Sequence, residues 1–306
     1  MNQGESAMAA KLHGVLPPMT TPFNSDGEIE VAPIRKQVRF LLDQGAHGLV
    51  PGGSTGEGHT FETDELRRVI ATVTEEAAGR VPVIAGVIVD STRQAINKVR
   101  AISDLGVAAL QVTPVHYLFR PDDEHMLKHF RAITEETGIP IIIYNVIPWS
   151  YLSPELLVRI MQEVPGVIGV KQSAGDLKLL ADLMITAPKD KLIFAAIDAL
   201  LYPSFSLGAH GAISALLSAV PGTVVQLWNA VEAGNHTLAR EIHEKLLVLW
   251  NAVFAQNMCS CIKYVQELQG CQSLLPRAPM PPASAEQKAA IRAALKGLNL
   301  EIAKAA

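Results

Sequence analysis

The chain has 306 residues, of which 49% are apolar and 18% charged, so it can bury a large core in one α/β barrel or in two smaller domains. A net charge of −4 without long runs of one sign disfavours nucleic acid and anionic membranes as main partners and favours small molecules. The first ten residues lack the pattern of a signal peptide, and every long apolar segment is interrupted before membrane length. These features predict a cytoplasmic protein.

Short β-branched runs alternate with amphipathic segments of helical length for about eight rounds, which is typical of a parallel sheet covered by helices. The predicted strands cover residues 14–18, 47–51, 81–87, 108–113, 140–145, 167–171, 192–196 and 211–214. The predicted helices cover residues 31–44, 63–78, 92–105, 122–137, 154–163 and 177–185. Their boundaries carry Ser91 and Ser153 as N-caps, Pro154 in a first turn, and Gly45, Gly106 and Gly138 after helix ends.

The number of strands favours closure of the sheet. The eighth strand ends near residue 215, about the length that a (β/α)8 TIM barrel needs. From about residue 220 the pattern is helical without strands, broken by a proline-rich stretch at 276–282. We therefore predict a flexible N-terminus over 1–11, a (β/α)8 barrel over 12–219 and a C-terminal helical region over 220–306.

Three cysteines, Cys259, Cys261 and Cys271, lie near one another in the last third of the chain. They form no CxxC pair, and no upstream histidine stands at zinc-binding spacing. No cluster of His, Asp or Glu falls at the predicted strand ends either. We expect reduced thiols and no metal site.

Lys171 closes an apolar run over 167–171 that is predicted to be a barrel strand. Burial disfavours an ammonium unless it is paired, so such a site should lower the pKa of the amine and leave a nucleophile able to form an imine with a ketone. The alternative is a strand-end lysine whose amine reaches water or pairs with a carboxylate. Position alone does not decide between these two interpretations.

Tyr144 lies near the end of the preceding apolar strand. In a barrel of sequential neighbours, Tyr144 and Lys171 come from adjacent strands at the same height, where a phenol could pass protons to an adduct on the amine. Gly169, on the same face as Lys171, would leave room below it. A buried tyrosine is more often a core residue with a satisfied hydroxyl.

The glycine-rich segment 51–58 follows the second predicted strand. Its glycines let the backbone approach a ligand, Ser54 and Thr55 add hydroxyl groups, and successive N–H groups in such a turn bind small carboxylates. An ordinary βα loop would look similar. His210 could act as a base, but it precedes the eighth strand and is expected to face the wrong end of the barrel. Asp198 could accept hydrogen bonds from a substrate or from a helix N-terminus, and we expect the helix cap.

These motifs together resemble the dihydrodipicolinate synthase and N-acetylneuraminate lyase family of class I aldolases. The resemblance rests on the order Gly53-Ser54-Thr55-Gly56-Glu57, Tyr144-Asn145 and Ile168-Gly169-Val170-Lys171, with further similarity at 81–86, 112–114, 208–214 and 275–298. It implies a TIM barrel, a homotetramer or dimer, and chemistry on pyruvate and an aldehyde without metal or organic cofactor.

The resemblance also implies roles for single residues. Lys171 matches the Schiff-base lysine and Tyr144 the proton-relaying tyrosine, with Ser54 as the hydroxyl beside it. Gly53 and Thr55 match the loop that holds the pyruvate carboxylate, and Ile213 matches the residue of the eighth strand that borders pyruvate. Tyr117 or His116 is expected to complete the proton relay across a subunit boundary, with Tyr117 taken as a substrate-binding residue.

One departure concerns the acceptor. The synthases of the family carry an arginine after the tyrosine that clamps the carboxylate of aspartate semialdehyde, whereas residues 146–152 here contain none and include Trp149 and Tyr151. We therefore predict a Schiff-base lyase that condenses pyruvate with an aldehyde or cleaves a 4-hydroxy-2-oxo acid. The alternatives are an authentic 4-hydroxy-tetrahydrodipicolinate synthase, a deoxy-oxo sugar acid dehydratase, and a pyruvate-binding barrel without catalysis.

Overall fold

The computed structural model describes residues 12–298 and residue 300. The predicted flexible N-terminus over 1–11 lies outside the described residues. Within them, parallel strands form one seven-stranded sheet in the order β1-β7-β6-β5-β4-β3-β2. The strands are β1 (Gly14–Val15), β2 (Ile84–Val87), β3 (Ala109–Val112), β4 (Ile141–Asn145), β5 (Val167–Gln172), β6 (Leu192–Ala195) and β7 (Gly211–Ala212).

The segment 47–51 joins the two edges of this sheet and closes the barrel. His47 N–H donates to Val15 O of β1 at 2.9 Å, and Ile84 N–H of β2 donates to Leu49 O at 2.9 Å. The predicted second strand therefore occupies its barrel position, but it forms only a bridge from Leu49 to Val83 instead of a regular ladder. Prolines explain this, because Pro17, Pro18, Pro51 and Pro82 in and beside the segment have no N–H to donate.

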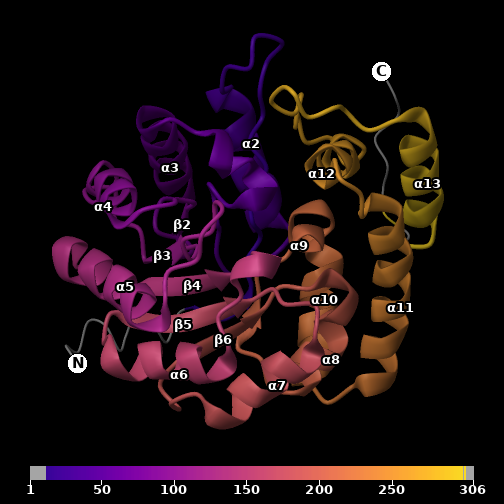
Figure 1. Ribbon diagram of the computed structural model, residues 1–306. Helices are drawn as coiled ribbons and strands as arrows, with labels where there is room; N and C mark the ends of the chain where they lie inside the picture. Colours follow the sequence, from indigo (N-terminus) through magenta and orange to yellow (C-terminus); the bar gives the residue numbers. More distant parts are fainter. Residues whose placement is uncertain (1–11, 299, 301–306) are drawn as a thin grey trace.

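Helices surround the barrel (Figure 1). The barrel helices are α2 (Val31–Asp43), α3 (Thr63–Ala77), α4 (Thr92–Arg100), α5 (Asp123–Thr137), α6 (Pro154–Glu163), α7 (Leu177–Thr186) and α8 (Leu201–Ser206). Ser91 and Ser153 cap α4 and α6 as predicted, each accepting an N–H three residues on. The prediction for 92–105 was too long, because α4 ends at Arg100 and tightens into i→i+3 turns up to Leu105.

The chain then continues through α9 (Ala215–Ala219) and α10 (Pro221–Glu232) to α11 (His236–Val253), α12 (Met258–Glu267) and α13 (Ala285–Lys296). Figure 1 shows α11 and α13 side by side on one flank, with α12 above the carboxyl ends of the strands near α9. No described helix combines the length and the apolar character needed to span a bilayer. The domain boundaries at 11 and 219 stay predictions.

Successive side chains along the strands point alternately to two apolar cores, one under the helices and one inside the barrel. Leu110 and Val112 of β3 belong to the large cluster under the helices. A smaller cluster inside the barrel contains Leu12, Leu16, Val50, Ile84, Ala108, Ala109, Ile142, Leu192, Phe194 and Ile213. Because Ile142 faces inward, period-two alternation directs Tyr144 of the same strand inward as well.

Candidate active site

Lys171 and Tyr144 are direct neighbours in the sheet. The register pairs Tyr144 of β4 with Lys171 of β5, and both side chains are buried. Nζ of Lys171 lies 3.7 Å from the centroid of the Tyr144 ring. The expectation that Gly169 leaves room below the lysine was wrong: a β-carbon there would lie 2.2 Å from Leu192 O, so the glycine permits close approach of β6.

Burial lowers the pKa of the Lys171 amine from 10.5 to about 7, because the charged form loses its hydration. The negative charge of Asp198 opposes this shift in part. Within the described residues Lys171 forms no ion pair at contact distance. At neutral pH a large fraction of this amine is unprotonated and carries the lone pair that attack on a carbonyl requires.

Tyr144 connects the amine to the glycine-rich loop. Its hydroxyl donates a hydrogen bond to Oγ of Ser54 at 3.2 Å. Burial raises the pKa of the phenol to about 12, while the hydrogen bond to Ser54 acts in the other direction. The phenol therefore remains protonated at neutral pH and can donate or relay a proton through Ser54.

The loop turns tightly through two 3-10 helices, η1 (Ser54–Gly56) and η2 (Gly58–Thr60). The N–H groups of Gly56 and Gly58 both donate to Gly53 O, at 3.0 and 3.1 Å. In the part of the chain that the structure describes, the N–H groups of Ser54 and Thr55 donate to no backbone carbonyl of a turn, a loop or a neighbouring segment. Two free amides at the start of a turn, beside the buried Thr55 side chain, suit a small anion.

Asp198 lies in η4 (Asp198–Leu200), the short 3-10 turn after β6, and caps a helix as predicted. Its carboxylate accepts the N–H groups of Leu216 at 2.7 Å and Ala215 at 3.3 Å, at the start of α9. Burial raises the pKa of this carboxyl to about 6, although these hydrogen bonds and Lys171 oppose the shift. Ile213, one residue after β7, is fully buried in the interior cluster, and its N–H donates to Ala195 O.

The segment after β3 lies at the rim. The side chain of Tyr117 is 79% exposed. Nδ1 of the His116 ring instead donates to Pro114 O at 2.9 Å and lies 3.5 Å from Oδ1 of Asp90. Among the described residues of a single chain, neither Tyr117 nor His116 contacts Lys171 or Tyr144. Their part in the proton relay therefore stays a prediction.

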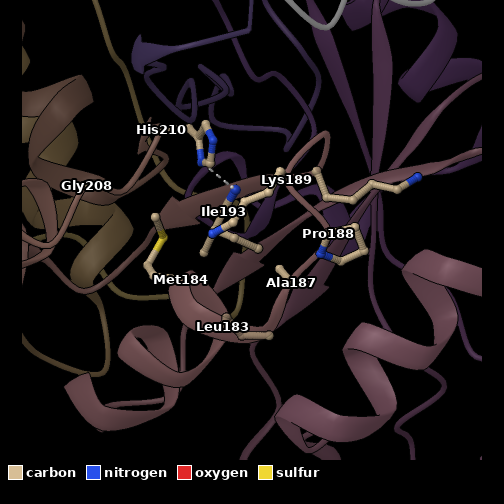
Figure 2. A pocket seen from close by; sticks show the side chains of 9 residues that line it. Leu183, Met184, Ala187, Pro188, Lys189, Ile193, Gly208 and His210 are labelled. Carbon is tan, nitrogen blue, oxygen red and sulfur yellow. Dashed lines mark hydrogen bonds between the residues drawn. The ribbon is translucent and has the colours of Figure 1, made fainter.

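A pocket at the opposite end of the barrel is separate from this site (Figure 2). His210, which precedes β7, lines it, and its Nδ1 accepts the N–H of Ile193 at 3.0 Å. The His210 side chain thus lies at the amino ends of the strands, as predicted, where it accepts a backbone hydrogen bond. Among the described residues, no three His, Cys, Asp or Glu side chains are arranged to hold a metal ion.

Comparisons with known proteins identify the family of this chain. Residues 11–298 match the model of the dihydrodipicolinate synthetase family. The chain belongs to this family. A 4-hydroxy-tetrahydrodipicolinate synthase from Methanopyrus kandleri is 36% identical over 296 residues, covering 96% of this chain and 98% of the relative. One from Maridesulfovibrio salexigens is 34% identical, covering 94% and 98%. The crystal structure of dihydrodipicolinate synthase from Aquifex aeolicus superposes with a TM-score of 0.90 at 26% identity, covering 96% of this chain and 100% of that one.

Membership of the dihydrodipicolinate synthetase family confirms the predicted family and TIM barrel. It also confirms an enzyme of the class I lyase type, since pyruvate condensation is the chemistry of this family. The three cysteines are free thiols.

Sequence reasoning missed several buried polar residues around the site. Gln111 of β3 is fully buried, and neither atom of its amide has a partner within the described residues. Lys263 of α12 pairs with Glu57 of the loop, and Sγ of Cys259 lies 3.5 Å from Ser54 O. Lys263 and Gln111 each interrupt an apolar run, and a polar residue within such a run is the signal that could have found them.

Proposed function

We propose that the protein is a Schiff-base lyase in which Lys171 forms an imine with pyruvate or a related 2-oxo acid. The observation that carries this proposal is the buried amine of Lys171, with its lowered pKa, held 3.7 Å from the ring of Tyr144. Because the neutral amine is the nucleophile, a site that stabilises it favours attack on a ketone. Family membership supports the same chemistry.

The reaction follows from these positions. Lys171 Nζ attacks the ketone carbon, and loss of water leaves a protonated imine that draws electrons from the adjacent methyl group. Removal of a methyl proton yields an enamine, which attacks the carbon of an aldehyde while the aldehyde oxygen takes up a proton. Water then releases the 4-hydroxy-2-oxo acid and restores the amine. The reverse sequence cleaves such an acid.

Tyr144 and Ser54 serve the proton transfers in this proposal. The phenol lies against the amine and donates to Ser54, so a proton can pass from the adduct toward the loop and back. Gly53 and Thr55 hold the carboxylate through the loop, and Ile213 borders the 2-oxo acid. Fixing the carboxylate orients the ketone toward Lys171, which supplies the positional part of the rate enhancement.

The rim of the site favours an aldehyde without a carboxylate. The loop after β4 contains no arginine, and Trp149 and Tyr151 stand in its place. Nε1 of Trp149 donates to His116 O at 2.7 Å, which ties this loop to the one after β3. Arg120, in the loop after β3, is paired with Asp123. An apolar or aromatic acceptor therefore suits the site better than aspartate semialdehyde, which argues against an authentic 4-hydroxy-tetrahydrodipicolinate synthase.

Assembly is a further part of the proposal. Tyr117, Leu118 and Phe119 expose a contiguous apolar patch, which is typical of a surface that contacts another protein. We infer a homotetramer or dimer in which Tyr117 reaches the site of a partner subunit. The free thiols fit the reducing cytoplasm.

Borohydride trapping tests the first step. Reduction in the presence of pyruvate should attach a three-carbon adduct to Lys171, located by mass spectrometry of peptides, and Lys171→Ala should abolish it. Absence of the adduct, or its attachment to another lysine, would sink the proposal.

Product analysis tests the second step. Incubation with pyruvate and a panel of aldehydes should consume pyruvate fastest with an uncharged aldehyde and slowly with aspartate semialdehyde. Faster turnover of aspartate semialdehyde would restore the synthase alternative, and loss of water from a deoxy-oxo sugar acid would favour the dehydratase. Trapping without turnover of any acceptor would favour a pyruvate-binding barrel.

A further inference from the structure

A buried ion pair joins the glycine-rich loop to the C-terminal helical region. Nζ of Lys263, in α12, lies 2.7 Å from Oε1 of Glu57, and the two side chains are 2% and 3% exposed. The same amine donates to Leu275 O at 2.7 Å. The second carboxylate oxygen of Glu57 accepts the backbone N–H of Arg277 at 2.9 Å. One glutamate thus receives hydrogen bonds from two separate parts of the C-terminal region.

Glu57 also occupies the turning point of the loop. Its φ of 59° places it in the left-handed region, where a residue with a β-carbon needs support from its surroundings. Its N–H closes η1 on Ser54 O at 3.0 Å, and its carbonyl accepts the N–H of Thr60 at 2.9 Å. The conformation of Glu57 therefore determines how Ser54 and Thr55 are presented.

Neighbouring contacts extend the connection on both sides. The Arg277 guanidinium donates to Thr60 O at 2.9 Å and to Gly27 O, and forms an ion pair with Glu65. Cys259, four residues before Lys263 on α12, places its sulfur near Ser54 O. The C-terminal region thus contacts the loop at Ser54, Glu57 and Thr60.

We propose that Glu57 and Lys263 are positioning residues that hold the carboxylate-binding loop in its active geometry. The C-terminal helical region then forms part of the active site, although neither residue touches the reacting atoms. This inference rests on the proposed function, because it assumes that the Ser54–Thr55 turn binds the 2-oxo acid. Free amides bind an anion well only when they are already aimed at it, and the ion pair of Glu57 with Lys263 fixes the turn that carries them.

A titration of borohydride trapping at Lys171 tests this inference. The variants are Glu57→Gln, which removes the charge that attracts Lys263, and Glu57→Asp, which keeps the charge but shortens the reach by one methylene. Both are measured at a temperature where circular dichroism shows the variant folded. The pyruvate concentration that half-saturates trapping should rise about 10- to 100-fold in Glu57→Gln and less in Glu57→Asp. The rate of turnover at saturating pyruvate should fall much less.

A matched control separates positioning from stability. Leu246→Ala opens a cavity in the buried face of α11, in the same C-terminal region but away from the loop. It should lower the melting temperature, yet leave half-saturation within about twofold of the wild type because it leaves the loop contacts in place.

Equal half-saturation in Glu57→Gln and Leu246→Ala would overturn the inference while leaving the lyase proposal intact. Should Glu57→Gln fail to fold, Glu57→Asp decides in the same way. Absence of trapping in the wild type would instead overturn the proposed function itself.

Discussion

Two lysines of this protein are buried to nearly the same degree in different surroundings. Lys171, at the end of β5, is 4% exposed and lies against the ring of Tyr144. Lys263, in α12, is 2% exposed and donates to Glu57 and to a backbone carbonyl. Burial lowers the pKa of both amines, but at Lys263 the carboxylate of Glu57 opposes the shift at contact distance.

This difference shows that burial alone does not make a nucleophile. A buried ammonium with a hydrogen-bonded carboxylate partner keeps its proton and becomes a structural link. A buried amine without such a partner loses its proton near neutral pH and becomes reactive. The presence of an anionic partner at contact distance therefore separates the two functions.

Replacing each lysine by methionine should separate them most clearly. Lys171→Met should lower turnover by on the order of 10³-fold or more while changing the free energy of unfolding by less than about 1 kcal/mol, because it replaces a neutral amine. Lys263→Met leaves Glu57 charged and unpaired, so it should cost about 3–5 kcal/mol of stability. Denaturant titration and turnover assays measure both effects, and a stable Lys263→Met protein would contradict the comparison.

Tyr144 tests the proton transfers that follow imine formation. Tyr144→Phe keeps the ring against Lys171 but removes the hydroxyl that donates to Ser54, so turnover should fall by about 10²-fold or more. Trapping of the pyruvate imine should persist at a reduced rate. The control is Tyr202→Phe, which removes a phenol of α8 whose hydroxyl contacts His236 of α11, and it should leave turnover unchanged. Full activity of Tyr144→Phe would remove the phenol from the mechanism.

His129 of α5 is another buried base, and its titration should appear in stability. Burial lowers the pKa of its imidazole from 6.5 to about 4. Between these values the unfolded chain binds the extra proton, so stability is fully present above pH 6.5 and is lost as pH falls toward 4, by at most about 3 kcal/mol. His129→Gln should flatten this part of the stability profile measured by denaturant titration. An unchanged profile would show that other groups dominate it.

The pH dependence of trapping should report the pKa of Lys171. With a pKa of about 7, the initial rate should be half-maximal near pH 7 and fall about tenfold per pH unit below it. Asp198→Asn keeps one oxygen that can accept the N–H of Leu216 but removes the charge that raises this pKa, so the midpoint should move to lower pH. A midpoint near the ordinary lysine value of 10.5 would contradict a buried neutral amine.

The smallest expected effect concerns Gln111, whose neutral amide is buried without a hydrogen-bond partner among the described residues. Gln111→Met removes an unsatisfied amide and keeps the side-chain length, so the free energy of unfolding should rise by about 1 kcal/mol. Gln37→Met is the matched control, because the amide of Gln37 donates to Thr20 and its loss should be destabilising. A destabilised Gln111→Met protein would show that the amide has a partner, such as an ordered water.

Much of the fold could be predicted from local pattern. The predicted helices at 63–78 and 154–163 match α3 and α6 within one residue, and the start of α6 carries the predicted cap Ser153 and Pro154. The position of the segment 47–51 in the barrel could be predicted, but its irregular pairing could not, since that pairing depends on prolines in neighbouring segments. The pair of Tyr144 and Lys171 could be predicted because adjacent parallel strands bring their carboxyl ends to one height.

The links between the barrel and the C-terminal region could not be predicted in this way. Glu57 and Lys263 are 206 residues apart, and the local pattern around either residue does not indicate a contact with the other. The same holds for Asp198, whose charge acts on Lys171 while its oxygens cap α9.

By itself the sequence determined the alternation of strands and helices, the apolar face of each, and the strand end that carries Lys171, because periodicity and capping act within a few residues. Only the tertiary structure decided which buried lysine has a carboxylate partner and which does not. Charge and desolvation depend on distance in space, and a folded chain sets those distances between residues that are remote in sequence.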